Sequence, residues 1–430
     1  MRRVVITGAG TVNPLGNDVP TTLAAMRSGR CAIGPLEGLR DQDRLAVQIG
    51  AQVRGFVPED HFDRQRLPFL DRFAQFALVA ARQAVAQAGV SFDGAPGERA
   101  GVVMGTAGGG NTTVDDNYRA VHAEGKNRVH PFVVPRLMHN AAASHISMEF
   151  GLRGPGLAVS TACASSNHAM GLALQLIRGG GADVIVTGGS EAMLCFGGLK
   201  AWEGLRVMSR HGCRPLAAPR NGLVMGEGGA VFVFEELEHA RARDAVILAE
   251  VAGFGMTSDA GDIVAPALDG PVRAMCLALA DAGLAAEQIG YVNAHGTGTT
   301  ANDRTEAQAL HAVLGSHAAL VPVSSTKSMH GHLIGGTGAV ELLACLLALR
   351  EGVIAPTVNF DSPDPDCAVD AVPNAARKVG AVAAVLSNAF AFGGLNAVLA
   401  LRRVQARAGA GGPAPRRRKA PTPPGVFRAR

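Results

Sequence analysis

The stretch VSTACASSNHAMG, residues 159–171, places one cysteine among small residues where an apolar run passes into a helical pattern. A thiol at the start of a helix faces unpaired backbone N–H groups and the positive end of the helix dipole, and both favour the thiolate. The same N–H groups can hold an oxyanion once the sulfur has attacked a carbonyl. Cys163 is therefore a candidate nucleophile, although a free cysteine more often fills space in a core.

The segments around this stretch alternate between short β-branched runs and alanine-rich helical patterns. Strands are predicted at residues 100–110, 182–193, 246–256 and 289–299, and two strands around a glycine turn at 383–401. Helices are predicted at residues 73–89, 167–180, 270–283 and 339–349. The opening RRVVITGAGTVNPLG is expected to be a strand that runs into a glycine turn, and Asn13 breaks the dinucleotide-binding pattern there. This alternation predicts an α/β protein.

The composition is that of a globular protein. The 430 residues are 47% hydrophobic and 18% charged, which is enough apolar material for a large core. Seven dispersed cysteines without a C-x-x-C pair argue against a disulfide framework and favour a reducing compartment. We recognise neither a signal-peptide core nor a membrane-spanning stretch, so we expect a cytoplasmic protein.

The charge is concentrated at the C-terminus. Residues 406–430 hold seven basic and no acidic residues, so they contribute +7 to a net charge of +4 and leave −3 for the rest. This Pro/Gly-rich segment, residues 405–430, is expected to be a disordered tail with at most weak contact with the inner face of the cytoplasmic membrane. The rest of the chain carries no nucleic-acid signature, so we expect no specific nucleic-acid partner.

Two histidine motifs lie in the second half of the chain. His295 follows an apolar run in NAHGTGTT, where a histidine satisfied by hydrogen bonds at a strand end is the alternative. The segment STKSMHGHLIGG brings Lys327, His330 and His332 in front of a helical pattern. His-x-His can indicate a metal, but no neighbouring Cys or carboxylate completes a ligand set, so we expect none. Lys327 is expected to need an acidic partner, for which Glu306 is the candidate.

A pair of phenylalanines precedes a Gly-Gly turn in SNAFAFGG. Two core aromatics beside a hairpin would explain Phe390 and Phe392. A functional Phe392 would instead lie at the mouth of a pocket and offer its backbone N–H. The residues leave both alternatives open.

The order Cys163, His295, Lys327, His332 resembles the β-ketoacyl-[acyl-carrier-protein] synthases, and in particular their elongating Cys-His-His type. The resemblance covers residues 2–404 and includes LRGPGLAVSTACASS, YVNAHGTGT, SSTKSMHGHL and SNAFAFGG. It implies a thiolase-like α/β fold, in which two similar βαβ-rich halves pack as α/β/α/β/α layers, and a homodimer. We expect residues 1–250 to form the half with the nucleophile, and residues 251–404 the half with the His, Lys and His residues.

The resemblance implies roles for the reacting groups. Cys163 would accept an acyl chain as a thioester, and a carbanion made from malonyl-carrier protein by loss of CO₂ would attack that thioester. His295 and His332 would donate hydrogen bonds to the malonyl thioester carbonyl. The N–H groups of Cys163 and Phe392 would form the oxyanion hole, and Phe392 would also act as a gate.

The resemblance also implies supporting residues and a partner. Lys327, together with Glu306, would orient the histidines, and Thr297 and Thr299 would line the pantetheine entrance. Acyl carrier protein would be the partner, since it brings phosphopantetheine with the acyl and malonyl groups. The chemistry would then need neither a cofactor nor a metal.

Several positions depart from the family pattern. Ala217 and Asn221 replace acids in RPLAAPRNG, and Val264 replaces a threonine often found near the malonyl site. Gly108 stands where a larger aliphatic residue is common at the acyl pocket, so the pocket should admit a longer or stiffer chain. These departures resemble a nodulation-type branch and predict an unusual, unsaturated acyl chain for a lipo-oligosaccharide signal. A housekeeping fatty-acid elongation synthase, a polyketide ketosynthase and a non-catalytic subunit resembling a chain-length factor remain alternatives.

Overall fold

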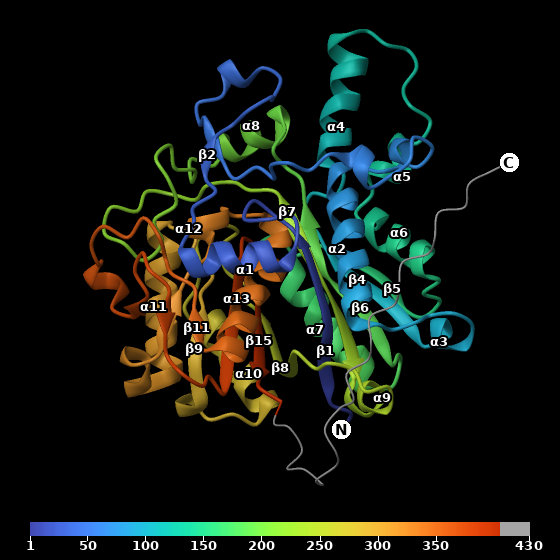
Figure 1. The fold of residues 1–430 in the computed structure, drawn as a ribbon. Coiled ribbons are helices and arrows are strands. Elements are labelled where there is room, and N and C mark those ends of the chain that lie inside the picture. Colours follow the sequence, from blue (N-terminus) through green and yellow to red (C-terminus); the bar gives the residue numbers. More distant parts are fainter. Residues whose placement is uncertain (405–430) are drawn as a thin grey trace, which may run out of the picture.

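The β-branched runs form the strands of one 11-stranded sheet in the computed structural model, which describes residues 1–404 (Figure 1). The strand order is β12-β10-β9-β14-β15-β8-β1-β7-β6-β4-β5. The strands of this sheet are β1 (Val4–Val12), β4 (Ala100–Gly105), β5 (Gly156–Val159), β6 (Val184–Glu191), β7 (Gly228–Glu236), β8 (Ala249–Ser258), β9 (Ile289–Asn293), β10 (Pro322–Ser324), β12 (Asp370–Ala371), β14 (Ala384–Ala391) and β15 (Leu395–Arg402). Two small sheets pair β2 (Gly34–Pro35) with β3 (Ile49–Gly50), and β11 (Val353–Ile354) with β13 (Arg377–Lys378). The predicted disordered tail, residues 405–430, lies outside the described residues.

The large sheet consists of two sets of strands with the same pairing pattern. In the first set β1 pairs antiparallel with β7, β7 antiparallel with β6, and β6 and β5 parallel with β4. In the second set β8, β15, β14, β9 and β10 repeat these pairings in the same order. An antiparallel pairing of β1 with β8 joins the two sets. The chain therefore folds as two similar halves, although no residue-level repeat marks them in the sequence.

Helices form three layers around and between the two sets of strands. Their bounds are α1 (Val19–Ser28), α2 (Arg72–Ala88), α3 (Ala95–Glu98), α4 (Asn111–Tyr118), α5 (Val133–Leu137), α6 (Ala141–Phe150), α7 (Ser165–Arg178), α8 (Phe196–Gly204), α9 (Leu237–Ala242), α10 (Asp269–Ala282), α11 (Thr300–Leu314), α12 (Lys327–His330) and α13 (Thr337–Glu351). Helices α2 and α6 cover the first set and α10 covers the second, whereas α7 and α13 contact strands of both sets. Figure 1 shows α2 and α6 on one side of the molecule and α10 and α11 on the other. This arrangement is the predicted layered α/β packing.

The middle layer explains why the helix predicted at residues 339–349 is apolar on all sides. Every residue of α13 from Thr337 to Leu349 is buried, because strands cover both of its faces. A helix that is apolar all round needs such an enclosed position. Among its buried side chains is one acid, Glu341.

The N-terminal segment differs from its prediction as a strand followed by a glycine turn. Strand β1 continues through the glycines to Val12. The backbone of α2 crosses so close to β1 that a Cβ at Gly10 would lie 2.0 Å from the carbonyl oxygen of Ala80. Glycine is required here for close approach of a helix rather than for a turn, a distinction that the local sequence does not reveal.

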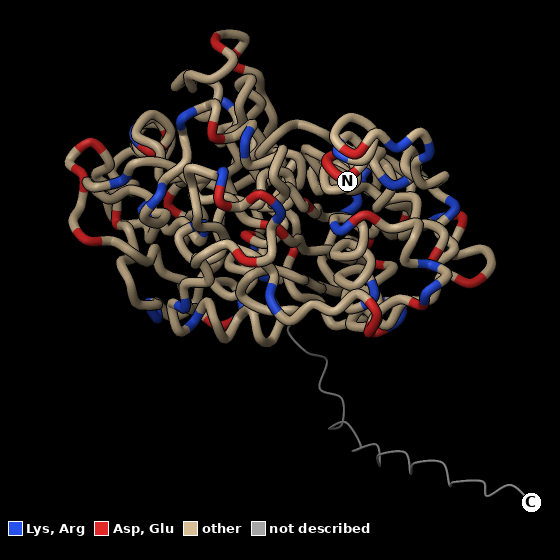
Figure 2. Tube along the Cα trace, turned by 90° about the horizontal axis from the view of Figure 1, so that it is seen from above, with Lys and Arg blue, Asp and Glu red and all other residues tan. Residues whose placement is uncertain are grey.

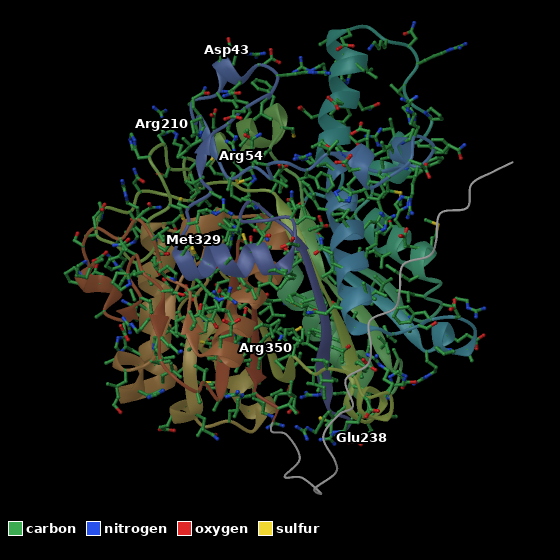
Figure 3. The ribbon with its side chains drawn as sticks, viewed as in Figure 1. Asp43, Arg54, Arg210, Glu238, Met329 and Arg350 are labelled. Carbon is green, nitrogen blue, oxygen red and sulfur yellow. The ribbon has the colours of Figure 1, made fainter. Side chains whose placement is uncertain are left out.

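Charged residues of both signs are interspersed over the described chain, as Figure 2 shows. Arg54 and Arg210 lie at the end of the molecule that carries β2 and α8, whereas Glu238 lies at the opposite end (Figure 3). Within residues 1–404, none of the helices combines the length and the apolar character that a membrane crossing requires.

Candidate active site

Cys163 lies in a tight turn between β5 and α7. The residues Ala162–Ala164 form a single 3-10 turn, and Ala162 adopts a left-handed conformation with φ 49°. The hydroxyl of Ser165 closes this turn, because it accepts from the N–H of Thr161 at 2.9 Å and donates to the carbonyl of Ala162 at 2.7 Å. The turn therefore fixes the backbone of Cys163 directly in front of α7.

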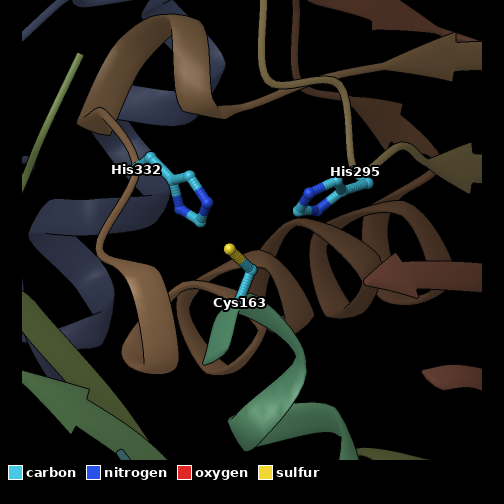
Figure 4. A group of neighbouring side chains, drawn as sticks. All are labelled: Cys163, His295 and His332. Atoms are coloured by element: carbon cyan, nitrogen blue, oxygen red, sulfur yellow. The ribbon is translucent and has the colours of Figure 1, made fainter. Parts of the chain in front are cut away.

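The two predicted histidines face this thiol from the other half of the molecule (Figure 4). The sulfur of Cys163 and one ring nitrogen each of His295 and His332 lie within 4.8 Å of one another. The imidazole rings are nearly perpendicular, with centroids 5.7 Å apart. All three side chains are at least 95% buried, since their exposed fractions are 5%, 3% and 0%. The structure therefore brings together the three residues that the sequence proposes as the reacting group.

The hydrogen bonds of His332 fix its tautomer. Its Nδ1 accepts from the backbone N–H of Ile334 at 3.2 Å and lies 2.8 Å from the hydroxyl of Thr337. An accepting Nδ1 carries no proton, so the proton of the neutral ring is on Nε2. That Nε2 is buried and has no partner in residues 1–404. His332 is therefore set to donate a hydrogen bond toward the thiol.

Burial and a nearby positive charge keep both imidazoles neutral. The pKa of His295 and the pKa of His332 lie well below their ordinary value, mainly because of burial and next because of the charge of Lys327. His330 is buried apart from this group, with its ring nitrogens on Thr326 and the carbonyl of Gly331. Both facing rings are thus uncharged at neutral pH, and the Nε2–H of His332 can act as a hydrogen-bond donor.

Glu306 supports His295 through the backbone rather than through Lys327. Its two carboxylate oxygens accept from the N–H of His295 at 2.8 Å and from the N–H of Gly296 at 2.7 Å. Asn388 donates to the same carboxylate at 3.1 Å. Glu306 therefore holds the loop that carries His295.

The prediction that Glu306 pairs with Lys327 is wrong. The ammonium of Lys327 donates to the carboxylate of Glu341 at 2.6 Å and to the carbonyl oxygen of His295. The side chains of Lys327 and Glu341 are 0% and 1% exposed, so this is a buried ion pair. Glu341 is the acid that interrupts the apolar helix pattern, and that interruption was the sequence signal for the true partner.

The Cys163 thiol differs from the thiolate expected at a helix start. Burial raises its pKa to about 11, although Lys327 and the backbone N–H groups of Phe392 and Cys163 itself act to lower it. Desolvation disfavours the charged form more strongly than these groups favour it. The resting residue is therefore a thiol, which needs a base before it can attack.

The sequence argument against a metal is also incomplete. It assumed that no cysteine or carboxylate lies near the histidines, whereas the fold supplies Cys163 as a third side chain of ligand type. Against a metal, the charge of Lys327 acts on Cys163 and on both imidazoles, and it would repel a divalent cation. The expectation of no metal remains a prediction.

A cavity of about 120 Å³ leads from the surface to the three side chains. The predicted pantetheine residues Thr297 and Thr299 line it, with their hydroxyls 2.8 Å apart, and Val264 lines it as well. Phe392 also lines it and is half-buried in the turn between β14 and β15, with its N–H on the Cys163 sulfur. Phe390 lies beside His295, with ring centroids 6.0 Å apart. Both phenylalanines therefore line the cavity, and Phe390 is also part of the hydrophobic core of the second half.

Gly108 is not among the residues that line this cavity. It lies in the loop after β4, where a Cβ would come within 3.1 Å of the Met193 sulfur. The buried carboxylate of Glu191 holds this loop, since it accepts from the N–H groups of Ala107 at 2.7 Å and Gly108 at 3.1 Å. It also accepts from Gly335 at 3.1 Å, close to His332. Glu191 was missed in the sequence because it ends an ordinary strand pattern.

One departure from the family pattern is compensated from a distant segment. Arg220 is buried and lacks an acid at position 217, but it forms an ion pair with Asp364 and lies 3.7 Å from Asp303. An antiparallel bridge between Ala217 and Pro363 brings the two segments together. The buried guanidinium therefore keeps a carboxylate partner. For Asn221, the structure shows a hydrogen bond from Ser209 at 2.7 Å.

Comparison with known proteins places this geometry in a family. Residues 1–240 match the N-terminal domain model of the beta-ketoacyl synthases, and residues 248–361 match the C-terminal domain model. The chain is 48% identical to nodulation protein E of Rhizobium sp. (strain N33) over 403 residues, which cover 94% of this chain and all of that protein. It is 39% identical to 3-oxoacyl-[acyl-carrier-protein] synthase 2 of Staphylococcus aureus (strain N315) over 412 residues, 94% and 99% of the two chains.

Comparison with a solved structure indicates the same family. The ishigamide ketosynthase/chain length factor superimposes with a TM-score of 0.88 at 36% identity, covering 94% of this chain and 100% of that one. The two similar halves, the layered helices and the whole length of the described chain are thus those of the thiolase-like ketosynthases. The chain belongs to the beta-ketoacyl synthase family and is an acyltransferase that forms carbon–carbon bonds.

Proposed function

We propose that Cys163, His295 and His332 carry out a decarboxylative Claisen condensation of malonyl-carrier protein with an acyl chain. The supporting observation is the convergence of one thiol and two neutral imidazoles in one buried cavity. In the first step an imidazole accepts the thiol proton, and the sulfur attacks the incoming thioester. The acyl group moves to Cys163, and the pantetheine sulfur leaves with that proton.

In the second step the malonyl group occupies the space in front of the two rings. Its thioester carbonyl accepts hydrogen bonds from His295 and His332, so the electron pair released with CO₂ is stabilised as an enolate. The carbanion then attacks the Cys163 thioester, and the C–S bond breaks. The N–H groups of Cys163 and Phe392 hold the developing oxyanion, since both already act on the sulfur. Lys327 positions the site through the His295 carbonyl.

The partner that delivers both thioesters is acyl carrier protein. The threonine pair Thr297 and Thr299 offers hydroxyls along the cavity to the amides of a pantetheine arm. Arg206 and Arg210 are exposed on either side of Val207, which lines the cavity. Guanidinium groups suit the phosphate at the base of that arm. Seven free cysteines support a cytoplasmic reaction.

The acyl chain is an unusual, unsaturated one that serves a lipo-oligosaccharide signal. The 48% identical relative bears the name nodulation protein E, which supports this branch. At Gly108 the missing side chain leaves room that the flexible Met193 now occupies. A methionine can move aside for a stiff chain more easily than a branched residue. A polyketide ketosynthase is the second candidate, favoured by the likeness to the ishigamide ketosynthase/chain length factor.

The mechanism is tested with Cys163→Ala and the matched Cys276→Ala, since Cys276 is an exposed thiol. We expect Cys163→Ala to lose acyl loading and condensation, whereas Cys276→Ala keeps both. Intact-mass spectrometry detects the acyl-enzyme, and product analysis detects the β-ketoacyl thioester. Condensation by Cys163→Ala would refute the mechanism. Condensation by Cys276→Ala, which keeps Cys163, would exclude the alternative of a non-catalytic partner subunit; loss of condensation in both variants would support that alternative.

The substrate proposal is tested separately by loading carrier-bound acyl chains of different length and unsaturation in competition. We expect long unsaturated chains to acylate Cys163 faster than short saturated ones. Preferred loading of short saturated primers would overturn the substrate proposal and leave the mechanism intact.

A further inference from the structure

The single tryptophan of the chain lies against the residue proposed as the gate. Trp202 on α8 stacks on Phe392, with ring centroids 5.9 Å apart and planes 26° from parallel. This is the offset-stacked geometry that aromatic pairs prefer. Within residues 1–404, Trp202 is the only aromatic side chain that Phe392 contacts in this way. Both side chains are half-buried, and Phe392 lines the cavity that reaches Cys163.

The tryptophan sits on a fixed platform. Glu203, the next residue of α8, accepts from the backbone N–H groups of Ala46 at 2.6 Å and Val47 at 2.9 Å. At the start of α8, the N–H of Gly197 donates to Asp115 at 3.2 Å. Trp202 itself packs against the main hydrophobic core. The indole is therefore held from both ends of its helix.

Phe392 lies in the turn between β14 and β15, directly before two glycines. Gly393 follows it in a left-handed conformation with φ 81°, and a Cβ there would meet no atom closer than 3.8 Å. The N–H of Gly393 donates to the carbonyl of Ile263 at 2.8 Å, so the turn itself is anchored, and the open space beside it leaves the phenyl ring room to change rotamer. A half-buried phenyl ring with open space beside it, stacked on an indole that its helix holds in place, has the parts that a two-position device needs.

We propose that Trp202 is the latch of the Phe392 gate: its indole holds the phenyl ring in place until an acyl chain displaces it. Trp202 acts through Phe392 and is thus a positioning residue that sets which acyl chains reach Cys163. An acyl chain that fills the space left by Phe392 makes contacts that offset the free energy of the lost stacking. An acyl chain that fills this space poorly does not. The inference rests on the gate role of Phe392 in the proposed function.

Intrinsic fluorescence tests the latch directly, because Trp202 is the sole tryptophan. We expect Phe392→Ala to shift the emission of the unloaded protein, since the indole loses its stacked neighbour. Loading Cys163 with dodecanoyl-pantetheine, which contains no tryptophan, should shift the wild-type emission in the same direction. Loading should add little in Phe392→Ala. The same samples are examined by intact mass, so a failure of Cys163 to load counts against the proposed function and not against the latch.

Two results would overturn the latch. Unchanged emission in unloaded Phe392→Ala would show that the rings do not interact. An equal shift on loading in wild type and Phe392→Ala would show that the chain touches the indole without moving the gate.

Competition between a saturated and a rigid polyunsaturated pantetheine thioester gives the second measurement. Trp202→Leu should change the ratio of their loading rates about two- to tenfold, the size of an aromatic stacking preference. Trp202→Phe, which keeps a stacked ring, should stay near the wild-type ratio. Phe196→Leu on the same helix is the matched control and should leave the ratio unchanged. A wild-type ratio in folded Trp202→Leu, or a loss of the ratio in Trp202→Phe equal to that in Trp202→Leu, contradicts the proposal.

Discussion

The ammonium of Lys327 has no contact with the thiol that would make it a reactant, yet its charge reaches every reacting group. It lowers the pKa of the Cys163 thiol and of both imidazoles, and it is held by Glu341 and the His295 carbonyl. A buried ion pair usually adds little to stability over an apolar pair of the same volume. The buried pair is therefore expected to serve the positioning role proposed for Lys327 rather than stability.

The pair Lys327–Glu341 gives a prediction that separates stability from activity. Glu341→Leu leaves a buried ammonium without its carboxylate and should lower the free energy of unfolding by about 3–5 kcal/mol. The double variant Lys327→Met/Glu341→Leu should recover most of that loss, because no charge remains buried. It should nevertheless stay inactive. Denaturant titration measures the first effect and a condensation assay the second, and a double variant that condenses at the wild-type rate would contradict the assignment.

The neutral histidines predict a loss of stability in acid. In the folded protein the pKa of His295 and the pKa of His332 lie well below 6.5, so below about pH 6.5 the unfolded chain binds more protons than the folded one. The free energy of unfolding therefore falls as the pH falls, by about 1.4 kcal/mol per pH unit for each such histidine. His332→Gln should reduce the slope between pH 6 and 5 by one such increment. The exposed His122→Gln is the control, and equal slopes for the two variants would speak against neutral buried rings.

At this scale the sequence predicted which side chains meet in the cavity but not their electrostatics. Cys163, His295, His332 and Lys327 were each found from local motifs. The partner of Lys327 was assigned to Glu306, because sequence proximity to a histidine motif does not show which carboxylate the fold brings to the ammonium. The pKa of Cys163 was expected to fall, because the helix start is visible in the sequence whereas the burial that raises it is not.

Among the elements, the contact between β1 and α2 depends on glycine. Gly10→Ala would place a Cβ 2.0 Å from the carbonyl oxygen of Ala80, and neither backbone can move without disturbing the sheet. We expect the free energy of unfolding to fall by about 3 kcal/mol, as in an overpacked core. Gly34→Ala is the control, since its nearest neighbour would be 4.0 Å away, and it should stay within about 0.5 kcal/mol of wild type. Thermal and denaturant unfolding measure both, and a stable Gly10→Ala would contradict the close approach.

The contact between β1 and α2 also shows what the spacing of apolar residues does not predict about helices and strands. The regular spacing of apolar residues correctly predicted β4, β6, α2, α7 and the hairpin of β14 and β15, because each of these elements buries a regular face. The glycines of β1 were assigned to a turn, since glycine in a loop and glycine under a crossing helix look alike in sequence. Long-range packing, which the sequence does not display, decides between them.

For the whole molecule, a homodimer remains a prediction that the sheet makes testable. Strand β5 is the outer strand at one end of the large sheet, and Leu157 on it is 45% exposed. Met148 of α6 and Val134 of α5 expose 68% and 61% of their surface. An open strand edge beside exposed apolar side chains suits pairing with a second copy about a two-fold axis.

Sedimentation velocity of Leu157→Asp tests this edge. We expect the wild type to sediment as a dimer and the variant as a monomer. The introduced carboxylate would be buried at the centre of the dimer interface without a partner of opposite charge. Leu320→Asp is the control, since Leu320 is 73% exposed on a different part of the surface. Identical behaviour of the two variants would place the interface elsewhere.

The two-half architecture was expected from the resemblance, and the repeated strand pairing now displays it without any residue-level repeat. The division at residue 250 remains a prediction, but the second set of strands begins with β8 at Ala249. The two halves can share a pairing pattern without sharing a sequence, because the pattern constrains mainly which positions are apolar. Cys163 lies among the strands and helices of the first half, whereas His295 and His332 lie among those of the second.

Because α13 is enclosed by strands of both sets, neither half can bury its own apolar surface when made alone. The connection between α9 and β8 is short and superficial, and Val246 in it is 67% exposed. A polypeptide cut at Val246 should therefore yield two pieces that precipitate separately yet reassemble into working enzyme when expressed together. Activity of the reassembled pieces would show that the site needs the two halves to pack together but does not need an unbroken chain between Cys163 and the two histidines.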